Sequence, residues 1–184
     1  MMENMQEEAR RTRDQLLVLD CLTGDPGAWS RLVRVYHESL NYYVSNIAAG
    51  SADDIMQEVW LKAYLSIRKL KDYRALRPWL YRIARGTAID SVRKSAVRSA
   101  EPLETEPVDT AHNIEFDSVD AKQIHKALAS LTDSHREMMT LFFLEELTMQ
   151  EISEVVEVPL GTVKSRLHHA KKALKAILTE MEYD

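Results

Sequence analysis

The chain of 184 residues has little of several things that particular classes of protein require. Its one cysteine, Cys21, excludes an internal disulfide and a cysteine-based zinc site, and we interpret it as a small core residue. Only five glycines and five prolines occur, and no run of alternating β-branched residues indicates a strand. The sequence therefore predicts an all-α fold.

The motifs of several common enzyme classes are also missing. No GxxxxGK[ST], GxGxxG, HExxH or GxSxG pattern is present. The sequence therefore lacks the motifs of phosphate-binding loops, zinc hydrolase sites and nucleophile elbows. No apolar run approaches the roughly 20 residues that span a bilayer, and residues 1–13 do not resemble a signal peptide. We predict a cytoplasmic protein that is not an enzyme, with no catalytic residue, metal site, cofactor, small-molecule substrate or membrane insertion.

Residues 148–175 have the pattern of a helix, a tight turn and a second helix. Thr148 and Glu151 have the spacing of a capping box, which begins a short helix that ends at Val155 or Val156. Pro159 stops that helix, because the residue before a proline is excluded from helical backbone angles, and it can open the next one. The second helix then carries one apolar stripe, made of Val163, Leu167, Ala170, Leu174 and Ile177.

The second helix is locally cationic in a chain of net charge −5. Residues 161–175 include five Lys or Arg and no acid. The polar residues that project away from the stripe are Lys164, Ser165, His168, Lys171, Lys172 and Lys175. Such a helix can be a solvated surface, but its position behind the turn favours a recognition helix in a DNA major groove.

Nearer the N-terminus, three helices are expected over residues 10–22, 26–48 and 51–70. Asp25 should cap the second, with Pro26 at its first position, and Ser51 should cap the third. The third has an inward apolar face and an outward stripe of Asp54, Gln57, Glu58, Leu61 and Leu65. Acids at a helix start complement its dipole, but this does not explain outward leucines, so the stripe favours a protein docking face.

From residue 68 to residue 98 there are ten Lys or Arg against two aspartates, with Tyr73, Trp79 and Tyr81 interleaved. Cations beside aromatic rings suit single-stranded nucleic acid, whose backbone follows charge and whose bases stack on rings. For Trp79 we favour core packing over base stacking. Pro78 should open a fourth helix with Arg82, Arg85 and Arg93 as a cationic partner surface.

Residues 101–120 contain seven carboxylates and no Lys or Arg, which predicts a flexible acidic linker. Two helices, over 119–131 and 133–144, should follow and pack beneath the helix-turn-helix, with their paired Met and Phe residues in the core. We therefore expect two small helical domains, residues 10–95 and 119–181, joined by a linker at 96–118.

Four segments together resemble the extracytoplasmic-function (ECF) sigma factors of bacterial RNA polymerase, over about residues 12 to 178. They are ADDIMQEVWLKAY, RPWLYRIARGTAID, LTDSHREMMTLFFLEELTMQEIS and VPLGTVKSRLHHAKKALK. The resemblance implies a dissociable subunit that directs core polymerase to a promoter class and promotes open-complex formation. It also implies an anti-sigma factor as partner and association with the nucleoid in the holoenzyme.

The resemblance also implies roles for particular residues. Docking on the clamp helices of the polymerase β′ subunit falls to Asp54, Gln57, Glu58 and Leu61. Recognition and melting of the minus-ten element, with capture of single-stranded DNA, falls to Lys71, Tyr73, Arg74, Arg77, Trp79, Arg82, Arg85, Gly86 and Arg93. Recognition of the minus-thirty-five element as duplex falls to Thr162, Lys164, Ser165, Arg166, His168, His169, Lys171 and Lys172, and this domain also meets the β flap.

This chain departs from the family pattern at three positions. Gly86 stands where Asn is often found, so a polar side chain that could hold a flipped base is missing. His169 replaces a frequent Arg, which removes a bidentate guanine contact, and Glu157 occupies a turn position that favours small residues tolerant of positive φ. Two other readings of the residues remain: a stand-alone helix-turn-helix regulator with an N-terminal sensor or dimerisation domain, and a helical adaptor that does not bind DNA.

Overall fold

The structure is a computed structural model that describes residues 2–48, 51–98 and 119–182. Within these ranges the chain is helical and contains no strand, which confirms the all-α prediction. The α-helices are α1 (Met2–Thr23), α2 (Ala28–Ser45), α3 (Ala52–Ser66), α4 (Leu76–Arg98), α5 (Val119–Ala129), α6 (Asp133–Met139), α7 (Met149–Val156) and α8 (Leu160–Glu182). Short 3₁₀ segments, η1 (Ile67–Lys69) and η2 (Tyr73–Ala75), precede α4, and a π-helical segment, η3 (Thr140–Leu144), follows α6.

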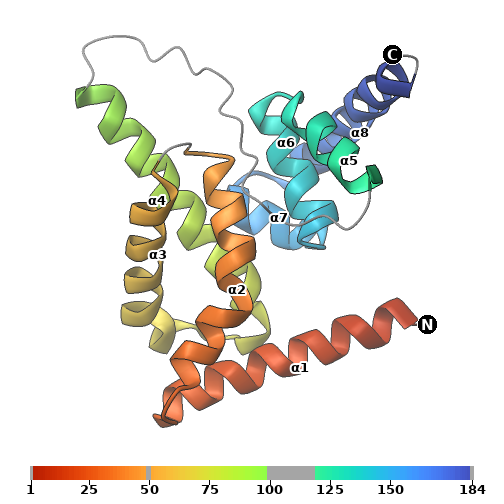
Figure 1. Ribbon diagram of the computed structural model, residues 1–184. Helices are drawn as coiled ribbons and strands as arrows, with labels where there is room; N and C mark the ends of the chain where they lie inside the picture. The colour runs from red at the N-terminus through yellow and green to blue at the C-terminus, as the bar shows by residue number, and fades with distance from the viewer. Residues whose placement is uncertain (1, 49–50, 99–118, 183–184) are drawn as a thin grey trace.

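Helices α1 to α4 form an N-terminal module, and α5 to α8 form a C-terminal module (Figure 1). In the N-terminal module α2 packs on α1, α3 and α4 through residues at helical spacing. The predicted inward face of α3 is confirmed, since Ile55, Met56, Val59 and Ala63 are buried. Burial of these apolar stripes leaves the opposite, outward face of α3 in solvent.

Several helix ends differ from the predictions. Gly27, in a left-handed conformation with φ 85°, precedes α2, whereas Asp25 makes no cap and forms an ion pair with Arg31. Ser51 does precede α3, but its side chain makes no capping hydrogen bond. Helix α4 begins at Leu76, ahead of Pro78. The helix tolerates Pro78 because the backbone N–H groups of a first turn have no helical partner, so the N–H that proline lacks is not missed. Helix α1 is longer than expected and starts at Met2.

The helix predicted over residues 133–144 is divided. Its α-helical part ends at Met139, and the π-helical segment η3 continues to Leu144. Met138 and Met139 are buried as predicted, but the core assignment of Phe143 is wrong, because half of that side chain is exposed. The wider π-helical turn shifts the positions that follow it, so the 3.6-residue spacing no longer identifies which side chains face inward.

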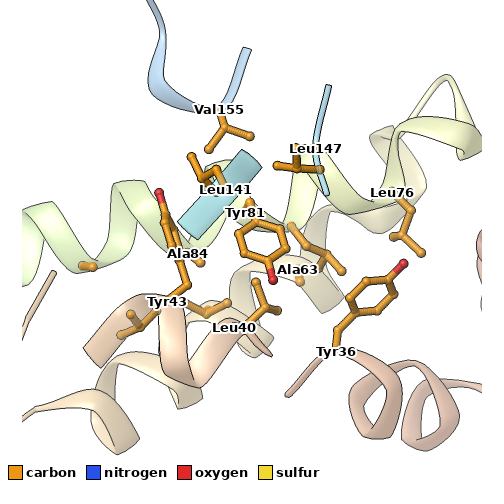
Figure 2. Close-up of a cluster of buried hydrophobic side chains, with 14 of the residues drawn as sticks. Tyr36, Leu40, Tyr43, Ala63, Leu76, Tyr81, Ala84, Leu141, Leu147 and Val155 are labelled. Atoms are coloured by element: carbon orange, nitrogen blue, oxygen red, sulfur yellow. The ribbon is translucent and has the colours of Figure 1, made fainter. Parts of the chain in front are cut away.

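One hydrophobic core extends through both modules. Tyr43 of α2 and Tyr81 and Ala84 of α4 are buried in the same cluster as Leu141 and Val155 of the C-terminal module. Figure 2 shows the side chains of the C-terminal module above the tyrosine and alanine side chains of the N-terminal module. The modules therefore share a core in this arrangement, with α7 packed on α4.

The predicted linker lies almost entirely outside the described residues. Helix α4 extends to Arg98, so residues 96–98, which were assigned to the linker, are helical. The rest of the predicted linker, residues 99–118, lies outside the described residues.

We predict that Leu141→Ala lowers the free energy of unfolding by about 2–5 kcal/mol, because the wild-type side chain is fully buried in the shared core. Urea denaturation followed by circular dichroism measures the loss. Leu65→Ala is the control: its leucine is 68% exposed, so the change should stay within about 0.5 kcal/mol. Two separate transitions, only one of them shifted by Leu141→Ala, would contradict a core common to both modules.

Candidate nucleic-acid interface

The helix-turn-helix forms as its sequence predicts. The Thr148 hydroxyl accepts a hydrogen bond from the Glu151 amide at 3.2 Å, and the Glu151 carboxylate accepts one from the Thr148 amide at 2.8 Å. This capping box begins α7, which ends at Val156. Val158 is then joined to α7 by the Ser153 hydroxyl, which donates to the Val158 carbonyl at 2.6 Å.

The turn places Glu157 in the left-handed region, with φ 56° and ψ 45°. A residue with a Cβ is strained there by roughly 1–2 kcal/mol relative to right-handed backbone angles. The positive φ at Glu157 agrees with the family pattern, which favours a small residue tolerant of positive φ at this turn position. Helix α8 begins three residues later, at Leu160.

Helix α8 has the two faces that its periodicity predicts. Val163, Leu167 and Ala170 are buried, and Leu174 and Ile177 are partly buried against the second core cluster. The opposite face is exposed and carries Lys164, Ser165, His168, His169 and Lys172. Thr162 is partly buried at the start of the helix. The exposed face is cationic, and it presents short polar groups beside long cations.

Arg166 and Lys171, two of the residues assigned to the minus-thirty-five element, lie on either side of this face. Arg166 is partly buried and lines a cavity of about 340 Å³ together with Arg85 and Glu137. The Lys171 ammonium lies over the rings of Phe142 and Phe143, at 4.7 and 5.1 Å from their centroids. This cation–π contact holds Lys171 against its own module.

The basic segment exposes a second cationic strip. Arg82, Gly86 and Arg93 are exposed along α4, and Lys71 and Arg74 are exposed just before it. The Asp72 side chain accepts from the Arg74 amide at 3.0 Å and so fixes the 3₁₀ turn that leads into α4. Tyr73 and Trp79 pack partly buried against the core, which agrees with the core-packing interpretation of Trp79.

Two of the predicted minus-ten cations are instead paired with the C-terminal module. Arg85 Nε lies 2.9 Å from Glu137 Oε1, and Arg77 Nη2 lies 3.3 Å from Glu145 Oε2. In this arrangement Arg85 is therefore paired within the chain, with a glutamate of the C-terminal module. Sequence reasoning did not find Glu137 or Glu145, because the paired residues are 52 and 68 positions apart and no local pattern joins them.

The outward stripe of α3 is exposed as predicted. Asp54, Gln57 and Glu58 are exposed, and Leu61 is 58% exposed. The Glu58 carboxylate pairs with Lys62 at 2.8 Å, and this hydrogen bond lowers the pKa of Glu58, which keeps the carboxylate charged. Leu65 and Tyr64 extend the exposed apolar surface along the same helix. Leu65 belongs to the predicted stripe, whereas Tyr64 was not predicted.

Within residues 2–48, 51–98 and 119–182, the chain has no group of three or more side chains that could hold a metal ion. In the same ranges, no helix combines the length and the apolar character that a membrane span requires.

Comparison with known proteins places these surfaces in a family. The family model for sigma-70 region 2 matches residues 31–98, and the model for sigma-70 region 4 matches residues 121–174. The ECF RNA polymerase sigma factor SigW of Bacillus subtilis strain 168 is 32% identical over 174 residues, which cover 86% of this chain and 92% of the relative. The chain is an ECF sigma factor.

Two further similarities agree. The ECF RNA polymerase sigma-E factor of Escherichia coli K12 is 28% identical over 88% of this chain and 92% of its own length. In fold, this sigma factor resembles the sigma factor RpoE of Bartonella quintana, with a TM-score of 0.71 and 22% identity over 83% of this chain and 98% of that one.

Family membership establishes the function. This ECF sigma factor directs core RNA polymerase to a promoter class and promotes open-complex formation, and its partners are core polymerase and promoter DNA. The stand-alone regulator and the helical adaptor are thereby set aside.

We predict that Gly86→Ala stabilises the sigma factor by about 1 kcal/mol, because alanine favours helix over glycine by that amount. A Cβ built at Gly86 meets nothing within 4 Å, so no clash offsets the gain. Thermal unfolding should show a midpoint about 2–4 °C higher. The control is Gly24→Ala, which should destabilise because φ is +78° there. A lower midpoint for Gly86→Ala would show that the fold requires glycine in α4.

Proposed function

We propose that three exposed surfaces of this sigma factor divide the work of promoter opening. The domain over residues 10–95 docks on polymerase and handles the minus-ten element, and the domain over residues 119–181 reads the minus-thirty-five element and meets the β flap. The observation that carries the proposal is that α3, α4 and α8 each expose a chemically different surface: leucines among acids, arginines, and lysines beside short polar groups. The sigma factor acts through binding energy alone and is not an enzyme.

Docking on the β′ clamp helices uses the outward stripe of α3. Leu61 supplies an apolar anchor, and Asp54, Gln57 and Glu58 form a polar rim beside it. Interfaces of this type gain most of their energy from a few buried apolar anchors, whereas rim charges mainly set orientation and association rate. Leu61 should therefore matter more for affinity than any one carboxylate.

Minus-ten recognition uses the cationic strip of α4 and the turn before it. Lys71, Arg74, Arg82 and Arg93 are placed to follow the phosphates of a displaced strand, because all four are exposed on one segment. Gly86 offers no side chain next to Arg82, so a flipped base there meets backbone and cations rather than an amide. Capture of the single strand favours the melted promoter, since a protein shifts an equilibrium by its differential affinity for the two states.

Minus-thirty-five recognition uses the exposed face of α8 in a major groove. Lys164, Ser165, His168 and His169 face the bases and their adjoining phosphates, and Lys172 reaches the backbone. Imidazole cannot make the bidentate contact to guanine that arginine makes, so His169 gives this sigma factor a different base preference at that position.

Regulation and location follow from the relatives. The similar structures include RpoE of Bartonella quintana with the anti-sigma factor NepR, and CnrH with the cytosolic domain of CnrY. We propose that this sigma factor is likewise held by an anti-sigma factor, and that it works in the cytoplasm, on the nucleoid when in holoenzyme.

Leu61→Glu should weaken binding to core polymerase at least tenfold, because the change places an unpaired carboxylate in the apolar centre of the docking face. Fluorescence anisotropy of labelled sigma factor titrated with core polymerase measures the affinity. Leu16→Glu is the matched control, since Leu16 is 55% exposed on α1, away from α3. Equal affinities for Leu61→Glu and wild type would remove the docking face.

Run-off transcription with core polymerase on a randomised promoter library tests the function as a whole.

Lys172→Ala should weaken DNA binding for every sequence and reduce the slope of log K against log salt by about 0.9, the value for one phosphate contact. His169→Ala should instead change the preferred minus-thirty-five sequence.

Lys126→Ala is the control for the salt slope, because Lys126 is exposed on α5 and lies outside the exposed face of α8. Specific start sites must appear with wild type; their absence would contradict the promoter-directing role of these surfaces. An unchanged sequence preference after His169→Ala would contradict base reading by His169.

A further inference from the structure

The cavity of about 340 Å³ has walls from five elements of the fold. Tyr43 of α2, Arg85 of α4, Ser134 of α6, Thr140 of η3 and Arg166 of α8 all line it. Small-molecule sites in proteins span roughly 300–1,000 Å³, so this volume is at the lower end of that range. The cavity is also much larger than a single water molecule requires, and its size suits a compact ligand.

Positive charge exceeds negative charge in the walls of the cavity. Three arginines line it, Arg85, Arg136 and Arg166, together with the carboxylates of Asp133 and Glu137. Glu137 is matched by Arg85, whose Nε lies 2.9 Å from its carboxylate. Asp133 offsets Arg136 only weakly, because the two charges are 3.5 Å apart and the Asp133 side chain is 95% exposed to solvent that screens it. The uncompensated charge therefore favours an anionic ligand.

Arg136 is fixed in the wall by groups that do not neutralise it. Its guanidinium donates to the backbone carbonyls of Leu128, Ala129 and Leu131 at 3.1, 2.8 and 2.9 Å. Carbonyl oxygens hold the guanidinium in place but carry no net charge, so its positive charge remains. Because the side chain is ordered in advance, an anion that binds beside it does not have to meet the entropic cost of ordering it.

Arg166 is the cation of the cavity that lacks a counter-ion. Its side chain is partly buried, and no ion pair or hydrogen bond engages its guanidinium within residues 2–48, 51–98 and 119–182. A guanidinium that is partly removed from water gains most from an anion with several oxygens, which it can bind through parallel charge-assisted hydrogen bonds.

A buried hydroxyl beside the same cavity also lacks a partner. Thr140 is 1% exposed, and its Oγ1 makes no hydrogen bond within the part of the chain that the structure describes. A helical threonine can donate to the carbonyl four residues earlier, as Thr87 does to Ile83 at 2.8 Å, but Thr140 begins the π-helical segment η3. Buried hydroxyls are usually satisfied, and π-helical turns are frequent at functional sites. Both observations mark this wall as a place where a bound molecule supplies the partner.

We propose that the cavity binds a small sugar phosphate. The phosphate group lies against Arg166 and Arg136, because its oxygens accept from guanidinium groups on different walls, which the two oxygens of a planar carboxylate do less well. This ligand is additional to the DNA contact proposed for Arg166.

The remaining walls suit a hydroxylated body rather than an aromatic one. The Asn46 amide nitrogen is already bound to the Tyr42 carbonyl at 2.9 Å, which leaves the amide oxygen to accept from a sugar hydroxyl. The Ser134 hydroxyl can donate or accept. Ile47 and Ile89 supply the apolar surface on which the C–H groups of a sugar ring pack.

Isothermal titration calorimetry of the full-length free sigma factor with ribose 5-phosphate tests the proposal. One molecule should bind per chain. Ribose should bind about tenfold more weakly or worse, because it lacks the group that pairs with the arginines. Inorganic phosphate should be weaker by a similar factor, because it lacks the body that contacts the remaining walls. If inorganic phosphate binds as tightly as ribose 5-phosphate, the assignment of a sugar phosphate is overturned.

Two variants locate the site. Arg166→Ala should weaken binding of ribose 5-phosphate about tenfold or more, since it removes a charge-assisted contact. Ser134→Trp should abolish binding, because its ring fills the cavity from an exposed position where the larger side chain does not disturb the core. Lys126→Ala is the matched control: it removes an exposed cation of α5 and should keep the wild-type affinity.

Three results would overturn the proposal. The first is no binding of ribose 5-phosphate to wild type up to about 10 mM. The second is binding that both Arg166→Ala and Ser134→Trp leave unchanged. The third is an equal loss in Lys172→Ala, which would place the ligand on the exposed face of α8. Because the titration contains neither polymerase nor promoter DNA, these results do not bear on the promoter contacts proposed above.

Discussion

The packing of the two modules depends on how the carboxylate of Glu145 is satisfied. This residue is 4% exposed, and a carboxylate removed from water is costly unless it is paired and hydrogen-bonded. Its partners, the Arg77 guanidinium and the Tyr81 hydroxyl, both belong to α4. Because its partners lie in the other module, Glu145 stays buried at low cost only while α7 and η3 remain against α4. Separation of the modules returns it to solvent.

The same chemistry satisfies Glu137. Its carboxylate pairs with Arg85 of α4 at 2.9 Å and accepts a hydrogen bond from the Tyr43 hydroxyl of α2 at 2.8 Å. A guanidinium binds a carboxylate through charge-assisted hydrogen bonds, which are stronger than those between neutral groups. Beside the shared apolar core, side chains of the N-terminal module therefore neutralise the carboxylates of the C-terminal module.

The sequence predicted well those features that are determined locally. The capping box of Thr148 and Glu151 acts within one helical turn, and the apolar stripe of α8 needs only helical periodicity, so both were confirmed. The exposure of Phe143 was not predictable from periodicity, because η3 is π-helical. The pairing of Arg85 with Glu137 joins residues 52 positions apart, and only the packed fold brings them together. The roles of the DNA-facing side chains stay predictions, since they concern contacts outside the chain.

The two flanks of α8 differ in how they depend on the other module. Lys171 rests on Phe142 and Phe143 of its own module, so its surroundings do not change when the modules separate. Arg166 lines the cavity between the modules together with Arg85. The exposed face of α8 carries Lys164, Ser165, His168, His169 and Lys172. The surroundings of Lys171 therefore depend on the C-terminal module, whereas those of Arg166 depend on how the two modules pack.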